Sequence, residues 1–335
     1  MFVPMEFAMN ELSNYLDEHF ENDRVLSPFD SITLHEVIKK LSDNHNLLDA
    51  LNNKGVRLGR IGLLRMPSQR VSDSTLLLGN YSEDKLIGVL HVSQIYDPSQ
   101  VTRSCSNARM IYNILPAPHN SHVLCPIYTG EIDRRTFSYT SYKHPLSSNY
   151  YWSLQKRLMK RPVLKWLCLL ADKADEHDNV DSVLENLYFF KGKNNFVNDF
   201  SDFVCESEKL LKSGKWKPFC IPDHNDLWRG NFLMDGSTYH FKSFRVIDWA
   251  AANVHGYGVH DLLTFSLSFG VSAKQLAPYF KLYMIKLGCD KQTLIYQYIA
   301  GMGYLGRNIN NFPYQRYCLK VKKEFELLKN VLMYL

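Results

Sequence analysis

The sequence predicts an α+β protein with two lobes, a small lobe rich in antiparallel β-strands and a larger, mainly helical lobe. Three observations predict this class. Short strand-like runs separated by turn residues fill most of residues 56–140. From residue 149 onward, apolar residues recur at three- and four-residue spacing, the period of an amphipathic helix. Within the helical part, residues 221–248 carry a polar cluster set between short apolar runs.

Residues 1–55 are predicted to form a helical extension ahead of the small lobe. The stretches 6–20 and 31–51 both carry apolar residues at helical spacing. Such an extension either packs against the small lobe or forms a module that binds a partner, and the sequence leaves both possibilities open.

Residues 56–145 are predicted to form the small β-rich lobe. One helix, over residues 97–115, interrupts its strands because a capping Asp97 precedes a run with helical spacing. Strands, then one helix, then more strands is therefore the expected order. The predicted strands cover residues 56–66, 74–79, 85–95, 122–130 and 135–142.

Residues 146–335 are predicted to form the large lobe, with helices on both sides of the polar cluster. The first helical pattern covers residues 150–178, with Pro162 starting its second half. The later helices cover residues 262–270, 273–288, 291–308 and 315–335.

Two charged stretches in the first half of this lobe admit more than one interpretation. The 150–178 helix has a basic face, which suits an anionic substrate, lipid headgroups or simply solvent. The acidic run that follows, over residues 172–185, fits a solvated loop and helix. The basic residues are Lys156, Arg157, Lys160, Arg161 and Lys165.

The polar cluster has the residues and the spacing of a catalytic loop followed by a β-hairpin. His224, Asp226 and Asn231 form the pattern H-x-D-x-x-x-x-N, and Asp248 ends the apolar run after it. Asp235–Gly236 supplies a turn signal between the two strand-like runs. A carboxylate such as Asp226 can orient a hydroxyl and accept its proton. Asn231 and Asp248 offer the hard oxygen ligands that Mg²⁺ prefers, and this ion accompanies phosphates.

The segments HNDLWRGN and VIDW resemble the catalytic loop and metal-binding segment of aminoglycoside, choline and fructosamine kinases, which share the protein-kinase fold. The resemblance is specific over roughly residues 222–265 and thin elsewhere. It implies an enzyme that uses ATP and Mg²⁺ to phosphorylate a hydroxyl of a small molecule. The acceptor would be a sugar or glycan intermediate, a ketosamine or an amino alcohol, and the form of the loop favours a sugar-type acceptor. In aminoglycoside and choline kinases acidic residues of the large lobe help to hold a cationic acceptor, so the resemblance makes the acidic run over residues 172–185 a weak pointer to such a substrate.

The same resemblance implies a role for each candidate residue. Asp226 would be the catalytic base, and Asn231 and Asp248 would be the metal ligands. His224 and Asp261 would support the loop, the latter from the segment GYGVHDLLTF. The interval from Asn231 to Asp248 is longer than the family pattern, and an extension of the hairpin over residues 238–243 can absorb the difference.

The small lobe departs from this family at the position that usually carries a phosphate-binding lysine. The segment GVLHV places His91 there, and the following helix offers Ser106 or Asn107 where the family has a glutamate. His91 is therefore the candidate nucleotide-binding residue, with Lys85 and Arg109 as other candidate cations. The other interpretation of His91 is a side chain that faces solvent or is hydrogen-bonded within the strand. The alternative is a pseudokinase that keeps the fold as a nucleotide-binding or protein-interaction module. The intact acidic and amide residues of the loop favour an enzyme, and the lack of an A-P-E-like segment after Asp248 disfavours a protein acceptor.

Composition limits the classes of partner and compartment. A net charge of +5 is too small by itself to indicate a nucleic-acid-binding protein. The resemblance implies a nucleotide and a small-molecule acceptor as the partners. Seven scattered cysteines form neither a disulfide framework nor a zinc motif, which predicts reduced thiols in a cytoplasmic protein. The N-terminal residues lack the pattern of a signal peptide, and no apolar run has the length of a transmembrane segment.

Overall fold

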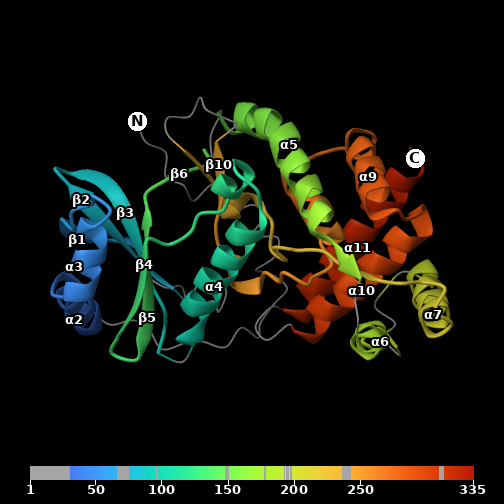
Figure 1. Ribbon diagram of the computed structural model, residues 1–335, viewed down its shortest axis with the longest axis horizontal. Coiled ribbons are helices and arrows are strands. Elements are labelled where there is room, and N and C mark those ends of the chain that lie inside the picture. Colours follow the sequence, from blue (N-terminus) through green and yellow to red (C-terminus); the bar gives the residue numbers. More distant parts are fainter. Residues whose placement is uncertain are drawn as a thin grey trace. The chain divides into compact units, whose positions relative to one another are not determined.

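The chain divides into two units, one built on a β-sheet and one mainly helical (Figure 1). The computed structural model describes residues 31–65, 75–95, 97–147, 151–176, 179–191, 193, 196, 198–235, 243–308 and 313–335. The first unit runs up to Thr102 and includes Pro126–Arg157, and the second includes Arg103–Cys125, Leu158–Asp235 and the chain from His240 onward. The predicted α+β class is confirmed.

A five-stranded antiparallel sheet forms the framework of the first unit. Its strand order is β1-β2-β3-β5-β4. Tight turns join β2 to β3 and β4 to β5, and both residues of each turn have positive φ: 49° and 62° at Glu83–Asp84, 46° and 61° at Asp133–Arg134. Such two-residue turns match the twist of paired strands. The strands are β1 (Arg60–Arg65), β2 (Leu76–Ser82), β3 (Lys85–Val92), β4 (Tyr128–Ile132) and β5 (Arg135–Ser141).

Helices α2 (Ser31–Ser42) and α3 (His45–Asn52) pack against one face of this sheet. The shared core buries four aliphatic side chains from the helices, Val37, Leu41, Leu47 and Leu51, against side chains of β2, β3 and β5. The described part of the predicted helical extension therefore packs on the sheet, while the predicted helix over residues 6–20 lies outside the described residues.

Seven helices account for most of the described residues of the second unit. Helix α8 lies among them and is largely buried. Eight of the eleven residues of α8 are buried, and it packs against α10 and α11. The last four helices match the predicted pattern. The seven are α5 (Tyr151–Leu170), α6 (Val180–Tyr188), α7 (Asn198–Lys212), α8 (Val259–Phe269), α9 (Ala273–Leu287), α10 (Lys291–Arg307) and α11 (Tyr314–Leu332).

We call residues 223–231 the polar loop. A short hairpin of β9 (Phe232–Met234) and β10 (Phe244–Val246) follows it, as predicted. Phe232 pairs with Val246 and Met234 with Phe244. The Phe232 ring also lies 5.5 Å from Phe265 and 5.3 Å from Phe269, which anchors β9 on α8. The predicted turn at Asp235–Gly236 extends beyond the described residues.

The structure corrects several predicted boundaries. Helix α4 (Ser99–Ile114) is close to its prediction, but the strand expected over residues 122–130 begins only at Tyr128. Pro162 lies inside a continuous α5 and does not start a new helix. The helical pattern expected to run to residue 178 ends at Leu170, and a two-residue strand, β7 (Asp175–Glu176), pairs with β8 (Phe219–Cys220). None of the helices in the described residues combines the length and the apolar composition needed to span a membrane.

Candidate active site

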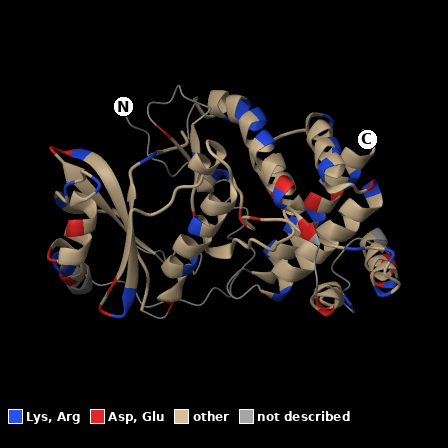
Figure 2. Ribbon diagram, in the orientation of Figure 1, with Lys and Arg blue, Asp and Glu red and all other residues tan. Residues whose placement is uncertain are grey.

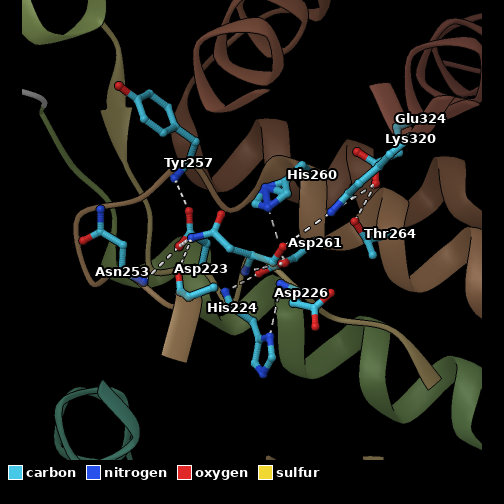
Figure 3. A network of polar contacts seen from close by, with 12 residues as sticks. Asp223, His224, Asp226, Asn253, Tyr257, His260, Asp261, Thr264, Lys320 and Glu324 are labelled. Carbon is cyan, nitrogen blue, oxygen red and sulfur yellow. Dashed lines mark hydrogen bonds and ion pairs between the residues drawn. The ribbon is translucent and has the colours of Figure 1, made fainter. Parts of the chain in front are cut away.

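The polar loop holds one exposed carboxylate on a buried backbone. Asp223, His224 and Asn225 are almost fully buried, whereas Asp226 is exposed. Asp261 of α8 holds this backbone: its Oδ2 accepts from the His224 amide at 2.6 Å and its Oδ1 from the Asn225 amide at 3.1 Å (Figure 3). Asn225 has φ 67°, a left-handed conformation that asparagine tolerates better than most residues. One α8 carboxylate thus fixes the two residues that precede Asp226.

His224 connects the loop to the end of β10. Its Nδ1 accepts from the Asp226 amide at 3.3 Å, so the ring proton lies on Nε2, which donates to the Ile247 carbonyl at 2.8 Å. Burial lowers the pKa of the His224 ring, which keeps it neutral. In this position His224 links the backbone at Asp226 to the backbone at Ile247, just after β10.

Asn231 links Asp226 to the segment that carries Asp248. Its amide nitrogen donates to the Asp226 carbonyl at 2.7 Å and to the Asp226 Oδ2 at 3.1 Å. Because both partners are acceptors, the amide oxygen of Asn231 must face the other way. The Asn231 backbone carbonyl accepts from the Ile247 amide at 3.0 Å, so Asp248 immediately follows a residue bonded to Asn231.

Asp248 is exposed and has a left-handed backbone, with φ 62° and ψ 61°. The residues after it are fixed by α4. Ser104 Oγ accepts from the Trp249 amide at 3.1 Å, and the Asn107 side chain donates to the carbonyls of Trp249 and Ala252 at 2.9 and 2.8 Å. Asn107 was considered as a substitute for the family glutamate; in the structure its amide instead anchors the backbone beyond Asp248.

The donor set at Asn231 and Asp248 fits Mg²⁺. It consists of one amide oxygen turned away from Asp226 and one exposed carboxylate, both hard ligands. Across the described residues, no group of three or more His, Cys, Asp and Glu side chains gathers as a metal site. Asn231 and Asp248 would supply two ligands, and phosphate oxygens and water would complete the coordination.

Asp223 is a buried support that the sequence did not indicate. Its Oδ1 accepts from the Asn225 side chain at 2.5 Å and from the Asn253 amide at 3.1 Å, and its Oδ2 accepts from the Tyr257 amide at 2.7 Å (Figure 3). A Cβ added to Gly256 would lie 2.0 Å from Asp223 Oδ2, so only glycine permits this approach. Burial beside Asp261 raises the pKa of the Asp223 carboxyl. The sequence feature that could have indicated this role is an acidic residue directly before His224.

Helix α11 also reaches the loop, through Lys320 and Glu324. Lys320 Nζ lies 3.4 Å from the Asn225 carbonyl and 3.9 Å from Glu324 Oε1, and the Thr264 hydroxyl of α8 donates to Glu324 at 2.6 Å (Figure 3). Burial raises the pKa of Glu324 to about 7. The sequence predicted a helix here but no part in the site, although a lysine and a glutamate four residues apart on an apolar stripe is a visible signal.

His91 belongs to the first unit, where β3 places it opposite Leu77 of β2 and Ser138 of β5. Its neighbours Leu90 and Val92 point into the core shared with α2 and α3, so the half-buried His91 side chain lies on the other face of the sheet. Burial, with a smaller effect of Arg65, lowers the pKa of His91 to about 4. His91 is therefore neutral at pH 7 and can offer a hydrogen bond but no positive charge.

Comparison with solved structures finds similar chains among small-molecule kinases. A putative fructosamine-3-kinase of Haemophilus somnus is 14% identical with a TM-score of 0.49, over 85% of this chain and 96% of that one. A choline kinase of Streptococcus pneumoniae is 11% identical with a TM-score of 0.45, over 90% of this chain and 100% of that one. An aminoglycoside phosphotransferase of Streptomyces rimosus, solved with ADP and streptomycin, is 9% identical with a TM-score of 0.44, over 81% and 98%.

No family model and no curated protein matches the sequence. The similarity to the three kinases thus extends over most of the chain in structure, without a match to any family at the level of sequence.

Proposed function

We propose that this protein transfers the γ-phosphoryl group of ATP, with Mg²⁺, to a hydroxyl of a small molecule. One observation carries the proposal. The exposed Asp226 carboxylate accepts a hydrogen bond from the Asn231 side chain, and the Asn231 carbonyl accepts one from the amide of Ile247, the residue before Asp248. A base and two hard-oxygen ligands are the groups that phosphoryl transfer requires of a protein, because positioning and charge neutralisation supply most of the catalysis.

Asp226 is the proposed base. Its Oδ2 accepts the Asn231 amide, which fixes the plane of the carboxylate and leaves Oδ1 to meet the acceptor hydroxyl. Asp226 would orient this hydroxyl toward the γ-phosphorus and accept its proton as the new P–O bond forms, while the bond from the γ-phosphorus to the bridging oxygen breaks and ADP leaves. General-base action of this kind contributes roughly 10²–10⁴ in rate.

Asn231 and Asp248 are the proposed metal ligands. Bound there, Mg²⁺ would offset the negative charge of the ATP phosphates. The protein's own contribution is to hold the two ligands in place, through the hairpin for Asn231 and through the contacts of Ser104 and Asn107 for the segment after Asp248.

The acceptor is proposed to be of sugar type. The loop HNDLWRGN is most similar to the form in fructosamine and aminoglycoside kinases. Two residues of the acidic run that pointed to a cationic acceptor already form ion pairs within the protein. Asp172 pairs with Lys286 and Glu185 with Arg307. Two of its carboxylates are thus already neutralised by the protein, which weakens the case for an amino alcohol.

A pseudokinase is the second candidate, and His91 is the observation that favours it. A neutral histidine in place of the family lysine gives the phosphates no charge partner, since its pKa lies at about 4. In this alternative the fold would bind nucleotide weakly or serve as an interaction module.

The test is an acceptor screen that follows ADP release in the presence of Mg²⁺. A panel of sugars, ketosamines and amino alcohols is offered to the wild type, to Asp226→Asn and to Glu326→Gln, which changes an exposed carboxylate on α11. We expect turnover with a sugar-type acceptor, a fall of about 10²-fold or more in Asp226→Asn, and no change in Glu326→Gln. Wild-type turnover in a folded Asp226→Asn protein would contradict the assignment.

A further inference from the structure

Charge is strongly segregated among helices α5, α6, α7 and α9. Helices α5 and α9 contain no aspartate or glutamate, and every charged residue on them is a cation. Figure 2 shows the Lys and Arg segments along both helices. The net charge of the chain is only +5, so this concentration is a local feature. The cations are Lys156, Arg157, Lys160, Arg161 and Lys165 on α5, and Lys274, Lys281 and Lys286 on α9.

Helices α6 and α7 are acidic by contrast. Helices α6 and α7 carry six acidic residues and only two lysines. The acids are Asp181, Glu185, Asp199, Asp202, Glu206 and Glu208, and the lysines are Lys209 and Lys212. Helix α11 carries five cations but also two glutamates, so among these helices only α5 and α9 combine several cations with no acid.

Helices α5 and α9 lie side by side and run in the same direction. Lys160 Nζ donates to the Gly270 carbonyl, just before α9, at 2.7 Å. Further along, the Cys168 thiol contacts the Tyr279 carbonyl at 3.7 Å, and Lys286 pairs with Asp172 just beyond α5. The contacts advance together along both helices, so α5 and α9 run alongside each other. We call the exposed cations of the two helices together the basic face.

The basic face also exposes apolar side chains. Leu158 on α5 is 39% exposed, and on α9 Leu282 is 38% and Ile285 is 68% exposed. Leu158, Arg161 and Lys165 recur at helical spacing on one side of α5. Exposed aliphatic groups interleaved with cations are typical of helices that lie on membrane surfaces, where the cations attract lipid headgroups and the apolar tips enter the acyl boundary.

We propose that the basic face binds an anionic lipid surface peripherally, through Arg161, Lys165 and Lys281 with Leu282 and Ile285. The cations alone would also suit a nucleic acid. The apolar groups favour a bilayer, because a phosphate backbone gives an exposed isoleucine no apolar partner. This surface does not depend on the proposed phosphotransfer, since it shares no residue with the loop at 223–231 or with Asp248.

The first test is co-sedimentation of the full chain with phosphatidylcholine vesicles, with and without phosphatidylglycerol. We expect binding only when the anionic lipid is present, and binding that weakens as salt is raised. In Arg161→Glu/Lys281→Glu the affinity should fall by more than about tenfold, because each cation near such a surface contributes about fivefold. The matched control is Lys322→Glu/Lys323→Glu, which makes the same charge change at exposed positions of α11 and should retain most of the binding.

Substitution of the apolar groups separates a lipid surface from any polyanion. Ile285→Ser leaves every charge in place and should weaken vesicle binding by about fivefold or more, while thermal melting shows that the variant is folded. The proposal is overturned if the wild type does not bind anionic vesicles at low salt, or if the two charge reversals weaken binding equally. Unchanged vesicle binding by Ile285→Ser, or retention by RNA without any vesicle binding, also overturns it.

Discussion

Asn225, the residue between His224 and Asp226, has its backbone held from two helices. Its amide donates to Asp261 of α8, and its carbonyl lies 3.4 Å from Lys320 Nζ of α11. A left-handed residue held at both its amide and its carbonyl cannot rotate without breaking one of these contacts, so the direction of the Asp226 side chain depends on both.

Lys320→Met tests this dependence. The substitution keeps the apolar stem and removes the charged amine, so the carbonyl of Asn225 loses its donor. We expect kcat for phosphoryl transfer to fall about tenfold with little change in the KM for ATP, because a displacement of the base affects the chemical step more than binding. Steady-state kinetics with Lys322→Met, an exposed neighbour on the same helix, as the control would check this. An equal effect of the two substitutions would show that Lys320 has no positioning role.

For single residues, the sequence predicts the candidates whose proposed role depends on the functional group of the side chain itself. The spacing of Asp226, Asn231 and Asp248 predicts a base and two metal ligands, because these roles need particular functional groups. Asp223 and Asn107 were not assigned these roles, since they bind backbone groups at 249–257 that are distant along the chain. Nothing in a local pattern specifies which main-chain amide or carbonyl a side chain will meet after folding.

The contact between α8 and α11 includes a buried acid. Glu324 is fully buried, accepts from Thr264 and lies 3.9 Å from Lys320. Burial raises the pKa of Glu324 from its ordinary 4.5 to about 7, against the opposing effects of Lys320 and Thr264. Asp261 of α8 and Tyr298 of α10 are further titratable groups near it. The folded protein therefore binds a proton at Glu324 more tightly than the unfolded chain does.

The consequence is a pH-dependent stability difference between Glu324→Gln and the wild type. Between pH 4.5 and about 7 the folded wild type holds more protons at Glu324 than the unfolded chain, so this residue's contribution to stability falls as pH rises. We expect the two proteins to be similar near pH 5 and the variant to be more stable at pH 8. The difference should be on the order of 3 kcal/mol, since each tenfold change in proton affinity is about 1.4 kcal/mol.

Urea unfolding across this pH range measures the difference. Glu326→Gln, an exposed substitution of the same kind on the same helix, is the control. Parallel stability profiles for Glu324→Gln and the wild type would show that Glu324 is ionised alike in the folded and unfolded states.

Helices that bury a wide stripe of apolar residues could be predicted from the sequence. Helices with a narrow apolar stripe could not. Helices α8 to α11 bury long stripes and match their predicted ranges closely. Helix α7 buries Phe200, Val204 and Leu211 among charged residues, which gives a weak periodic signal. The pairing of β7 with β8 joins two-residue strands far apart in sequence, and segments this short have no period of their own.

For the whole molecule, the α+β class followed from the order of strand-like and helical patterns. The division of the chain was harder to place, because it falls within α4, between Thr102 and Arg103, and within α5, between Arg157 and Leu158. Turn residues and composition shifts mark boundaries between elements, so they cannot mark a division inside a continuous helix. The basic face is a similar case, since α5 shows its cations in the sequence but its pairing with α9 depends on the fold.

The central claim is that Asp248 and Asn231 form the metal site of an ATP-using enzyme, and titration calorimetry tests it most directly. ATP is titrated with and without Mg²⁺ into the wild type, Asp248→Ala and the exposed control Glu326→Ala. We predict that the wild type and the control bind ATP only with Mg²⁺ and that Asp248→Ala loses this binding while remaining folded. Absence of binding in the wild type, or Mg²⁺-dependent binding unchanged in Asp248→Ala, would contradict the claim.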